Sequence, residues 1–239
     1  MFSVIIPAYN EERYLPRLLD SIKKQKVQPS EIIVADADSE DRTKEIAIKY
    51  GCKIVKGGRI SVSRNNGAKV AKSNIIVFID ADTELLNEDF FNKIIGTFIK
   101  RNADVASCYF LPSDKKVKYS IPMAGVNAFK FISHKLKQNR VTGGACIIST
   151  KNAFKKVNGF NTRMRSHEDN HFFQKSVKHG LKFIIIPQFI HTSTRRFERK
   201  KLKKILFLGL ISFIAGTIGS AWVKKKKKKA DNDFWDDVI

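Results

Sequence analysis

Two carboxylates that directly follow an apolar run are the first residues in this chain whose spacing could do chemistry. The run is Ile75–Ile79, and Asp80 and Asp82 come after it. Such a run is typical of a strand buried on both faces in a parallel sheet. Residues two apart in a strand point the same way, so the two carboxylates would share one side and repel each other. A divalent cation or a bound cationic group would remove that repulsion, and a helix-capping aspartate is the simpler alternative.

A second stretch with chemical potential is "HEDNH", which starts at His167. On a helix, an HExxH pattern puts His167 and His171 on one face, where two imidazoles can hold zinc and Glu168 can act as a peptidase base. His191 is then a candidate third ligand. Two ordinary surface histidines are the alternative to this zinc site, and the pattern alone does not choose between them.

The elements that would position these residues alternate along the first half of the chain. Strands are expected at Phe2–Ile6, Glu31–Ala35, Cys52–Val55 and Ile75–Ile79, and helices at Glu11–Lys24, Asp41–Lys49 and Val62–Ala71. This βαβ series predicts an α/β fold, a mostly parallel sheet flanked by helices with right-handed crossovers. The carboxyl end of such a sheet is where these folds bind ligands, which suits Asp80 and Asp82.

The pattern loosens after a helix expected at 88–100 and a strand at 104–110. Apolar residues at helical spacing then predict a basic amphipathic helix, namely Met123, Val126, Phe129, Ile132 and Leu136. A short helix at Lys151–Val157, a helix at His167–His179 and a strand at Phe183–Ile186 complete the expected elements.

The composition fits one globular domain with an appendage. The chain has 239 residues, of which 43% are hydrophobic, and a formal net charge of +22. That charge indicates an anionic partner, which is nucleic acid, a membrane surface or a phosphorylated substrate. Cys52, Cys108 and Cys146 are odd in number and far apart, which argues against a disulfide framework or a CxxC metal site. We expect a reducing compartment, and the amino terminus does not have the pattern of a signal peptide.

The C-terminal part of the sequence differs from the rest. Ile205–Val223 contains no charged residue, and as a helix it would be about 28 Å long, close to the hydrocarbon thickness of a bilayer. We therefore expect a catalytic domain over 1–200, a membrane helix over 205–223 and a polybasic, then acidic, tail over 224–239. Small residues at 212, 216 and 220 could pack a second copy of this helix, which would give a homo-oligomer.

Five motifs in order give the chain a family resemblance. They are "VIIPAYNEE", "IIVADADSEDRT", "SRNNGAKVAKSNIIVFIDADTEL", "TGGACIISTKNAFKKVNGF" and "HEDNHF". Together they resemble the family 2 glycosyltransferases, which have the GT-A (Rossmann-like) fold, over about residues 2–195. The resemblance implies a nucleotide-sugar donor. It implies donor contacts from Pro7, Tyr9, Asn10, Glu11, Asp36, Arg64, Asn65, Asp80, Gly143 and Gly144.

Within this resemblance each group of residues has an implied role. Asp36 would accept from the base edge, and Asp38 stands where the family often has glycine. Asp82 would hold Mn²⁺ or Mg²⁺ against the diphosphate, with Asp80 and His191 nearby, and the ion would neutralise the leaving group. Asp169, beside Glu168, would take the proton from an acceptor hydroxyl.

The resulting expectation is an inverting, metal-dependent glycosyltransferase at the cytoplasmic side of a membrane. Its acceptor would be lipid, lipid-linked or polyprenyl phosphate, and nucleic acid is not expected as a partner. Charge does not fix the topology, because the basic clusters on both sides of 205–223 are similar in size. A zinc peptidase built on His167, Glu168 and His171 is the second hypothesis, and a non-catalytic basic protein that binds membrane or nucleic acid is the third.

Overall fold

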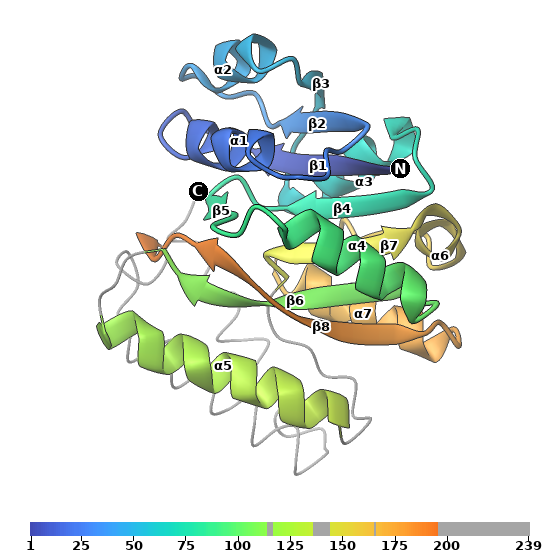
Figure 1. The fold of residues 1–239 in the computed structure, drawn as a ribbon. Coiled ribbons are helices and arrows are strands. Elements are labelled where there is room, and N and C mark those ends of the chain that lie inside the picture. The colour runs from blue at the N-terminus through green and yellow to red at the C-terminus, as the bar shows by residue number, and fades with distance from the viewer. Residues whose placement is uncertain (114–116, 136–143, 165, 196–239) are drawn as a thin grey trace. The chain divides into compact units, whose positions relative to one another are not determined.

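The structure, a computed structural model, describes residues 1–113, 117–135, 144–164 and 166–195 (Figure 1). Residues Met1–Ser193 form one compact unit. The predicted membrane helix at 205–223 and the tail at 224–239 lie outside the described residues, as do Leu136 and Gly143. Within the described part of the chain, no helix is both long enough and apolar enough to cross a bilayer.

One sheet contains all the described strands, in the order β3-β2-β1-β4-β7-β6-β8-β5. The strands are β1 (Phe2–Ala8), β2 (Glu31–Asp36), β3 (Lys53–Lys56), β4 (Ile75–Ile79), β5 (Thr83–Glu84), β6 (Val105–Pro112), β7 (Cys146–Thr150) and β8 (Phe183–Thr192). The helices are α1 (Leu15–Lys23), α2 (Thr43–Lys49), α3 (Ile60–Val70), α4 (Phe90–Lys100), α5 (Val117–Lys135), α6 (Lys151–Lys156) and α7 (Glu168–Lys178).

The sheet is mostly parallel, as expected, and of the described strands only β7 and β5 run against the others. Strands β3, β2, β1 and β4 run parallel, as the βαβ series predicts. Strand β7 is antiparallel to both β4 and β6, and β5 is antiparallel to β8. The sequence pattern indicates neither β5 nor β7, because β5 has only two residues and β7 is a short run that ends in Ser149 and Thr150.

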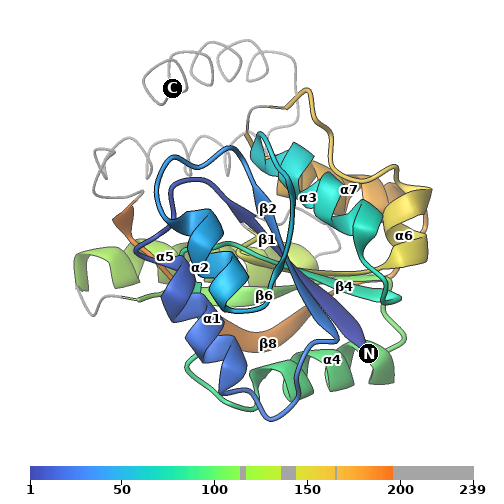
Figure 2. The same cartoon turned by 90° about the horizontal axis from the view of Figure 1, so that it is seen from above.

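Helices cover both faces of the sheet, and the core therefore has two layers (Figure 2). Helices α1, α2 and α4 pack on one face, and α3, α6 and α7 pack on the other. Strand β4 confirms the prediction of a doubly buried strand, since Val77 and Ile79 join the first layer while Ile76 and Phe78 join the second. Its end is thereby fixed from both sides.

Two boundaries differ from the sequence prediction for local reasons. Helix α1 begins at Leu15 rather than Glu11, because the carbonyl of Glu11 accepts from Tyr14 and Leu15 in a turn and Pro16 lies in the first helical turn. Strand β8 continues beyond Ile186 to Thr192. Its exposed Pro187 lacks an amide donor and lies beside a register shift in the pairing with β6.

Helix α5 forms as predicted, but its apolar residues do not share one face. Met123 is buried, whereas Ile132 is 53% exposed. These residues are nine positions apart, which is about two and a half turns of helix, so their side chains lie on opposite sides. A repeat of three residues drifts around the helix, and the spacing of Met123, Val126, Phe129 and Ile132 therefore does not predict one buried stripe.

Candidate active site

The predicted site residues meet at one edge of the sheet. The parallel strands β1, β2 and β4 end there, so the residues that follow them, Tyr9, Ala37 and Asp80, lie at the same edge. Strand β7 runs the other way and begins there, since Cys146 pairs with Ile79. Chain segments that are far apart in sequence thus gather around the end of β4.

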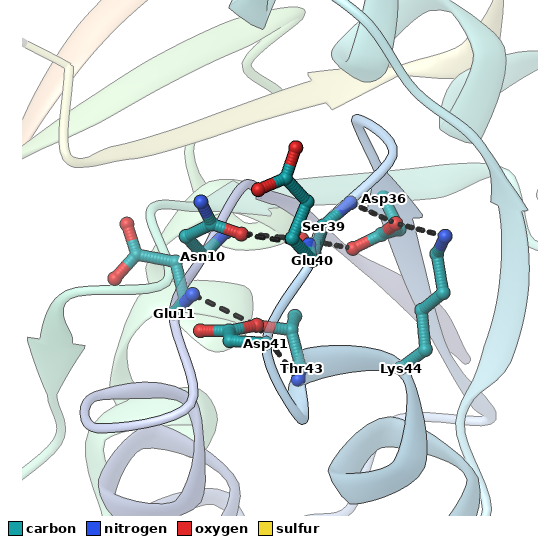
Figure 3. Close-up of polar contacts among 8 residues, drawn as sticks. All are labelled: Asn10, Glu11, Asp36, Ser39, Glu40, Asp41, Thr43 and Lys44. Carbon is teal, nitrogen blue, oxygen red and sulfur yellow. Dashed lines mark hydrogen bonds and ion pairs between the residues drawn. The ribbon is translucent and has the colours of Figure 1, made fainter.

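Side-chain hydrogen bonds join the loops after β1 and β2 (Figure 3). The amide of Asn10 donates to Ser39 Oγ at 3.0 Å, and its own Oδ1 accepts from the amide of Glu40 at 2.9 Å. The amide of Glu11 donates to Thr43 Oγ1 at 2.8 Å. These contacts fix the backbone where the sequence predicts nucleotide binding, while Tyr9 is 56% exposed and Pro7 lies in β1 opposite Ala35.

Asp36 is buried and holds the second of these loops. Its carboxylate accepts from Ser39 twice, from the hydroxyl at 2.6 Å and from the amide at 3.0 Å, and it pairs with Lys44 at 3.4 Å. Asp38 adopts a φ of 61°, in the region that glycine enters most easily. The turn therefore keeps the glycine-like backbone that the resemblance implies, with an aspartate in it.

Arg64 is the buried centre of the site. Its side chain is 2% exposed, Nη1 donates to Glu168 at 2.8 Å, and Nη2 donates to Asp80 at 2.8 Å. The guanidinium also lies 5.2 Å from the ring centre of Phe160. Arg64 therefore links the end of β4 to the start of α7, and both of its outer nitrogens are engaged by carboxylates.

Glu168 and Asp169 have different surroundings at the start of α7. Glu168 is buried, and burial together with the charge of Asp169 raises its pKa, an effect that Arg64 opposes. Asp169 is only partly buried, and its Oδ1 accepts from the amide of Asn170 at 2.7 Å. Glu168 bonds Arg64, whereas Asp169 acts on Arg64 only through its charge and is the more open of the two to an acceptor.

Gly144 lies where a side chain would collide with this site. A Cβ there would come within 2.7 Å of Ile147 Cδ1 and 3.2 Å of Asp169 Cβ. Glycine thus lets the segment just before β7 approach Asp169 closely. Asn65 bonds both the carbonyl and the amide of Phe160 through its side-chain amide, at 2.8 and 2.9 Å, and so ties α3 to the segment before α7.

The predicted metal ligands lie around the end of β4 and the end of β8. The carbonyl of Asp82 accepts from the amide of Ser193 at 2.9 Å, and Glu84 pairs with His191 across β5 and β8. His191 Nδ1 lies 3.3 Å from the carbonyl of Pro112, which leaves Nε2 as the nitrogen available for a metal. In the described part of the chain, no three side chains of His, Cys, Asp or Glu are grouped closely enough to hold an ion unaided.

The zinc peptidase hypothesis receives no support from this geometry. His167 precedes α7 with a φ of 59°, so it is not on the helix that would align it with His171. Glu168, the required base, is engaged by Arg64.

Sequence reasoning missed one buried cation near this site. Lys130 of α5 is fully buried, and its Nζ donates to Ser107 Oγ at 2.8 Å and to the carbonyl of Cys108 at 2.6 Å. Burial lowers its pKa to about 8, and Asp169 is among the charges that oppose this shift. The sequence signal for this buried lysine was its place within the apolar pattern of the predicted helix. Because a lysine is rarely buried without partners, a polar partner on the neighbouring strand could then have been expected.

Comparison with known proteins identifies the family. A sequence model described as "Glycosyl transferase family 2" matches residues 3–158. The chain belongs to this family. A 4,4'-diaponeurosporenoate glycosyltransferase of Staphylococcus haemolyticus is 41% identical over 108 residues, which are 41% of this chain and 28% of that protein. The family match contains the Asp80 and Asp82 pair and ends before α7.

Several solved structures share the fold of this chain. TarS residues 1–349 of S. aureus, in complex with UDP-GlcNAc, gives a TM-score of 0.64 at 19% identity and covers 80% of this chain and 58% of that one. A mannosyltransferase of Pyrobaculum calidifontis, in complex with GDP-Man and Mn²⁺, gives 0.63 at 20% identity and covers 81% and 56%. In each of these three comparisons, the match spans less than two thirds of the relative's length.

Proposed function

We propose that this family 2 chain transfers a sugar from a nucleoside-diphosphate sugar to an acceptor, with inversion at the anomeric carbon. One observation carries the proposal: Arg64 joins Asp80, the first carboxylate after β4, to Glu168, the neighbour of Asp169. This link would fix the position of a donor at the end of β4 relative to Asp169, the carboxylate that would receive the acceptor's proton. Such positioning supplies much of the rate in transfer reactions.

The donor side supports a nucleoside diphosphate and leaves the base open. The two solved neighbours are named with UDP-GlcNAc and GDP-Man, which share a sugar diphosphate and differ in the base. Here the oxygens of Asp36 are engaged by Ser39 and Lys44. Asp36 then acts mainly by holding the loop of Asp38 and Ser39, and the backbone of that loop would meet the base.

The residues present fit a divalent cation whose coordination shell would be completed by phosphate oxygens of the donor. Asp80 and Asp82 offer carboxylate oxygens, which suit Mg²⁺ or Mn²⁺, and His191 Nε2 is a further candidate ligand. Mg²⁺ is often held by one or two carboxylates together with substrate phosphates, which agrees with the lack of a three-ligand group in the described residues. When bound, such an ion would neutralise charge on the departing diphosphate.

Asp169 would act on the acceptor side. It accepts the proton of an acceptor hydroxyl while that oxygen attacks the anomeric carbon and the bond from this carbon to the diphosphate breaks. Glu168 would keep Arg64 in place and take no proton. A phosphate acceptor is already ionised and would need no base, so the effect of removing the Asp169 carboxylate distinguishes the two acceptor types.

For the acceptor we propose a lipid or lipid-linked molecule at the cytoplasmic face of a membrane. The uncharged stretch 205–223 and the basic residues around it support this location. The chain's net charge of +22 also favours an anionic surface. A cysteine introduced by Ala230→Cys and probed with an impermeant thiol reagent in sealed cells tests the topology, because labelling from outside indicates a full span and protection until lysis a re-entrant helix.

A donor screen tests the reaction itself. The purified chain would be incubated with a panel of nucleotide-sugars and Mn²⁺, and stabilisation and nucleoside diphosphate release would be measured. We expect one donor to raise the melting temperature and to be turned over, and Asp82→Asn to reduce both effects strongly. Asp20→Asn, which removes an exposed carboxylate on α1, is the matched control and should keep them. Absence of both effects with every donor would contradict the proposed function.

A further inference from the structure

Helix α5 turns two polar side chains, Asn127 and Lys130, toward the protein. Asn127 bonds the backbone of Phe110 twice, from Nδ2 to the carbonyl at 2.7 Å and from the amide to Oδ1 at 3.3 Å. Lys130 reaches Ser107 and Cys108, and Met123 is buried. Positions 123, 127 and 130 are four and three residues apart, so they form one face of the helix, the face against β6.

The opposite face of α5 is apolar and exposed. Ile121 is 71% exposed and Ile132 is 53% exposed. Gly125 and Ala128 lie between them and are also exposed, and a Cβ built on Gly125 would meet no atom within 4 Å. Positions 121, 125, 128 and 132 recur at spacings of four, three and four, so they align along one side of the helix.

The place of α5 in the fold makes this face unusual. Figure 1 shows α5 beyond β6, at the end of the sheet opposite β3 and away from the helices that cover the two faces. Single exposed apolar residues are ordinary on protein surfaces, whereas an aligned strip is typical of an interaction site. Here the polar residues that a solvent-facing helix normally presents outward are used as anchors to β6.

The charge of the flanking residues indicates what binds to the exposed face of α5. The stretch 114–140 contains Lys115, Lys116 and Lys118 before the strip and Lys135, Lys137 and Arg140 after it, against the single acidic residue Asp114. A second copy of the chain would bring the same positive charge to the contact and be repelled. Apolar strips with basic residues at both ends are typical of helices that lie in the headgroup region of anionic membranes.

We infer that α5 is a membrane-docking helix whose strip of Ile121, Gly125, Ala128 and Ile132 enters the headgroup region of an anionic bilayer. The same helix is fastened beside the active site, since Lys130 bonds the strand next to β7, where Gly144 approaches Asp169. Docking would therefore hold the acceptor side of the site at the lipid surface. The inference goes beyond the proposed reaction and does not depend on it.

Lipid contact at position 128 tests the inference in the full chain. A fluorescent probe would be attached through Ala128→Cys, with a matched probe through Lys26→Cys in the loop that precedes β2. The protein would be reconstituted into vesicles of phosphatidylcholine, with and without an equal amount of phosphatidylglycerol, that carry a spin-labelled quencher lipid. The native cysteines 52, 108 and 146 are buried, which limits labelling elsewhere.

We expect strong quenching at position 128 in the anionic vesicles, weaker quenching in phosphatidylcholine alone, and none at position 26. Ile121→Asp with Ile132→Asp should abolish the quenching at 128 while affinity for UDP or GDP with Mn²⁺ stays unchanged, which separates this inference from the proposed reaction. No quenching in vesicle-bound protein would overturn the inference. A probe already shielded from water in detergent would also overturn it, because another part of the chain or a second copy would then cover the face.

Discussion

The two halves of the catalytic fold are held together by different means. Around β1–β3, parallel strands end in loops that bond each other through Asn10, Ser39 and Thr43. Around β6–β8, the strands are mixed in direction, β8 contains a proline, and α5 is fastened by Asn127 and Lys130. In the proposed function, the first half would form the donor surface and is called the donor half. The second half would form the acceptor surface and is called the acceptor half.

Arg64 links these halves through two buried ion pairs, so its removal should have the largest effect. Arg64→Met leaves Asp80 and the buried Glu168 without their cation, which we expect to lower the free energy of unfolding by about 3–5 kcal/mol, as for other broken buried pairs. Urea unfolding measures it, and Arg59→Met, at an exposed position before α3, is the control. Arg64→Lys should lose less. A loss below about 1 kcal/mol for Arg64→Met would show that the halves do not need this bridge.

Asp169→Asn tests the acceptor half without touching the donor half. With a hydroxyl acceptor, turnover should fall by roughly 10² to 10⁴, the range for a lost general base, while donor affinity changes little. Steady-state transfer and donor titration measure the two separately. Glu168→Gln should instead act mainly on stability, since it weakens the contact to Arg64. Equal and small losses of turnover in both variants would favour a phosphate acceptor or a base elsewhere.

Lys130 should give the acceptor half a pH-dependent stability. Its pKa is lowered by burial from 10.5 to about 8, so between these values the unfolded chain binds more protons than the folded one and stability rises with pH. The rise should not exceed about 3.4 kcal/mol. Lys130→Met should remove this rise, and Lys100→Met, at an exposed position on α4, should keep it. Thermal unfolding from pH 7 to pH 11 measures the difference, and parallel curves for wild type and Lys130→Met would contradict the assignment.

Ser39→Ala should have the smallest effect. It tests whether the contacts between the loops after β1 and β2 contribute to donor affinity. It removes the hydroxyl that donates to Asp36 and accepts from Asn10, and loss of such bonds typically costs about 1–2 kcal/mol. Donor affinity should fall by up to roughly tenfold, which corresponds to 1.4 kcal/mol. Calorimetry measures the affinity, and Ser30→Ala, at an exposed position before β2, is the control. Unchanged affinity would mean that the loop contacts do not prepare the donor surface.

The donor half could be predicted from sequence because its signals are local. The run Ile75–Ile79 needs burial on both faces, and the βαβ alternation fixes the parallel order, so the place of Asp80 at a sheet edge followed directly. The family comparison confirms the glycosyltransferase assignment that the motifs indicate. The assigned roles of Asp82, His191 and Asp169 stay predictions.

The rest depends on contacts between distant residues, which local patterns do not contain. The motifs indicate Arg64 as a donor-site residue but not its partners, Asp80 and a glutamate 104 positions away in sequence, between which it is buried. The direction of β7 depends on pairing with β4 and β6, and its own five residues do not specify it. The burial of Lys130 likewise depends on its hydrogen bonds to β6. The helical pattern of α5 therefore revealed the helix but not which of its faces turns inward.

The central claim is that the carboxylates after β4 bind a nucleoside diphosphate through a divalent cation. Titration calorimetry of UDP and GDP with Mn²⁺, on wild type, Asp82→Asn and the control Asp20→Asn, tests it most directly. We expect wild type and the control to bind at least one nucleotide with equal affinity, EDTA to abolish that binding, and Asp82→Asn to weaken it by roughly tenfold or more, which is 1.4 kcal/mol or more. Unchanged affinity in Asp82→Asn, or equal binding with and without metal, would contradict the account.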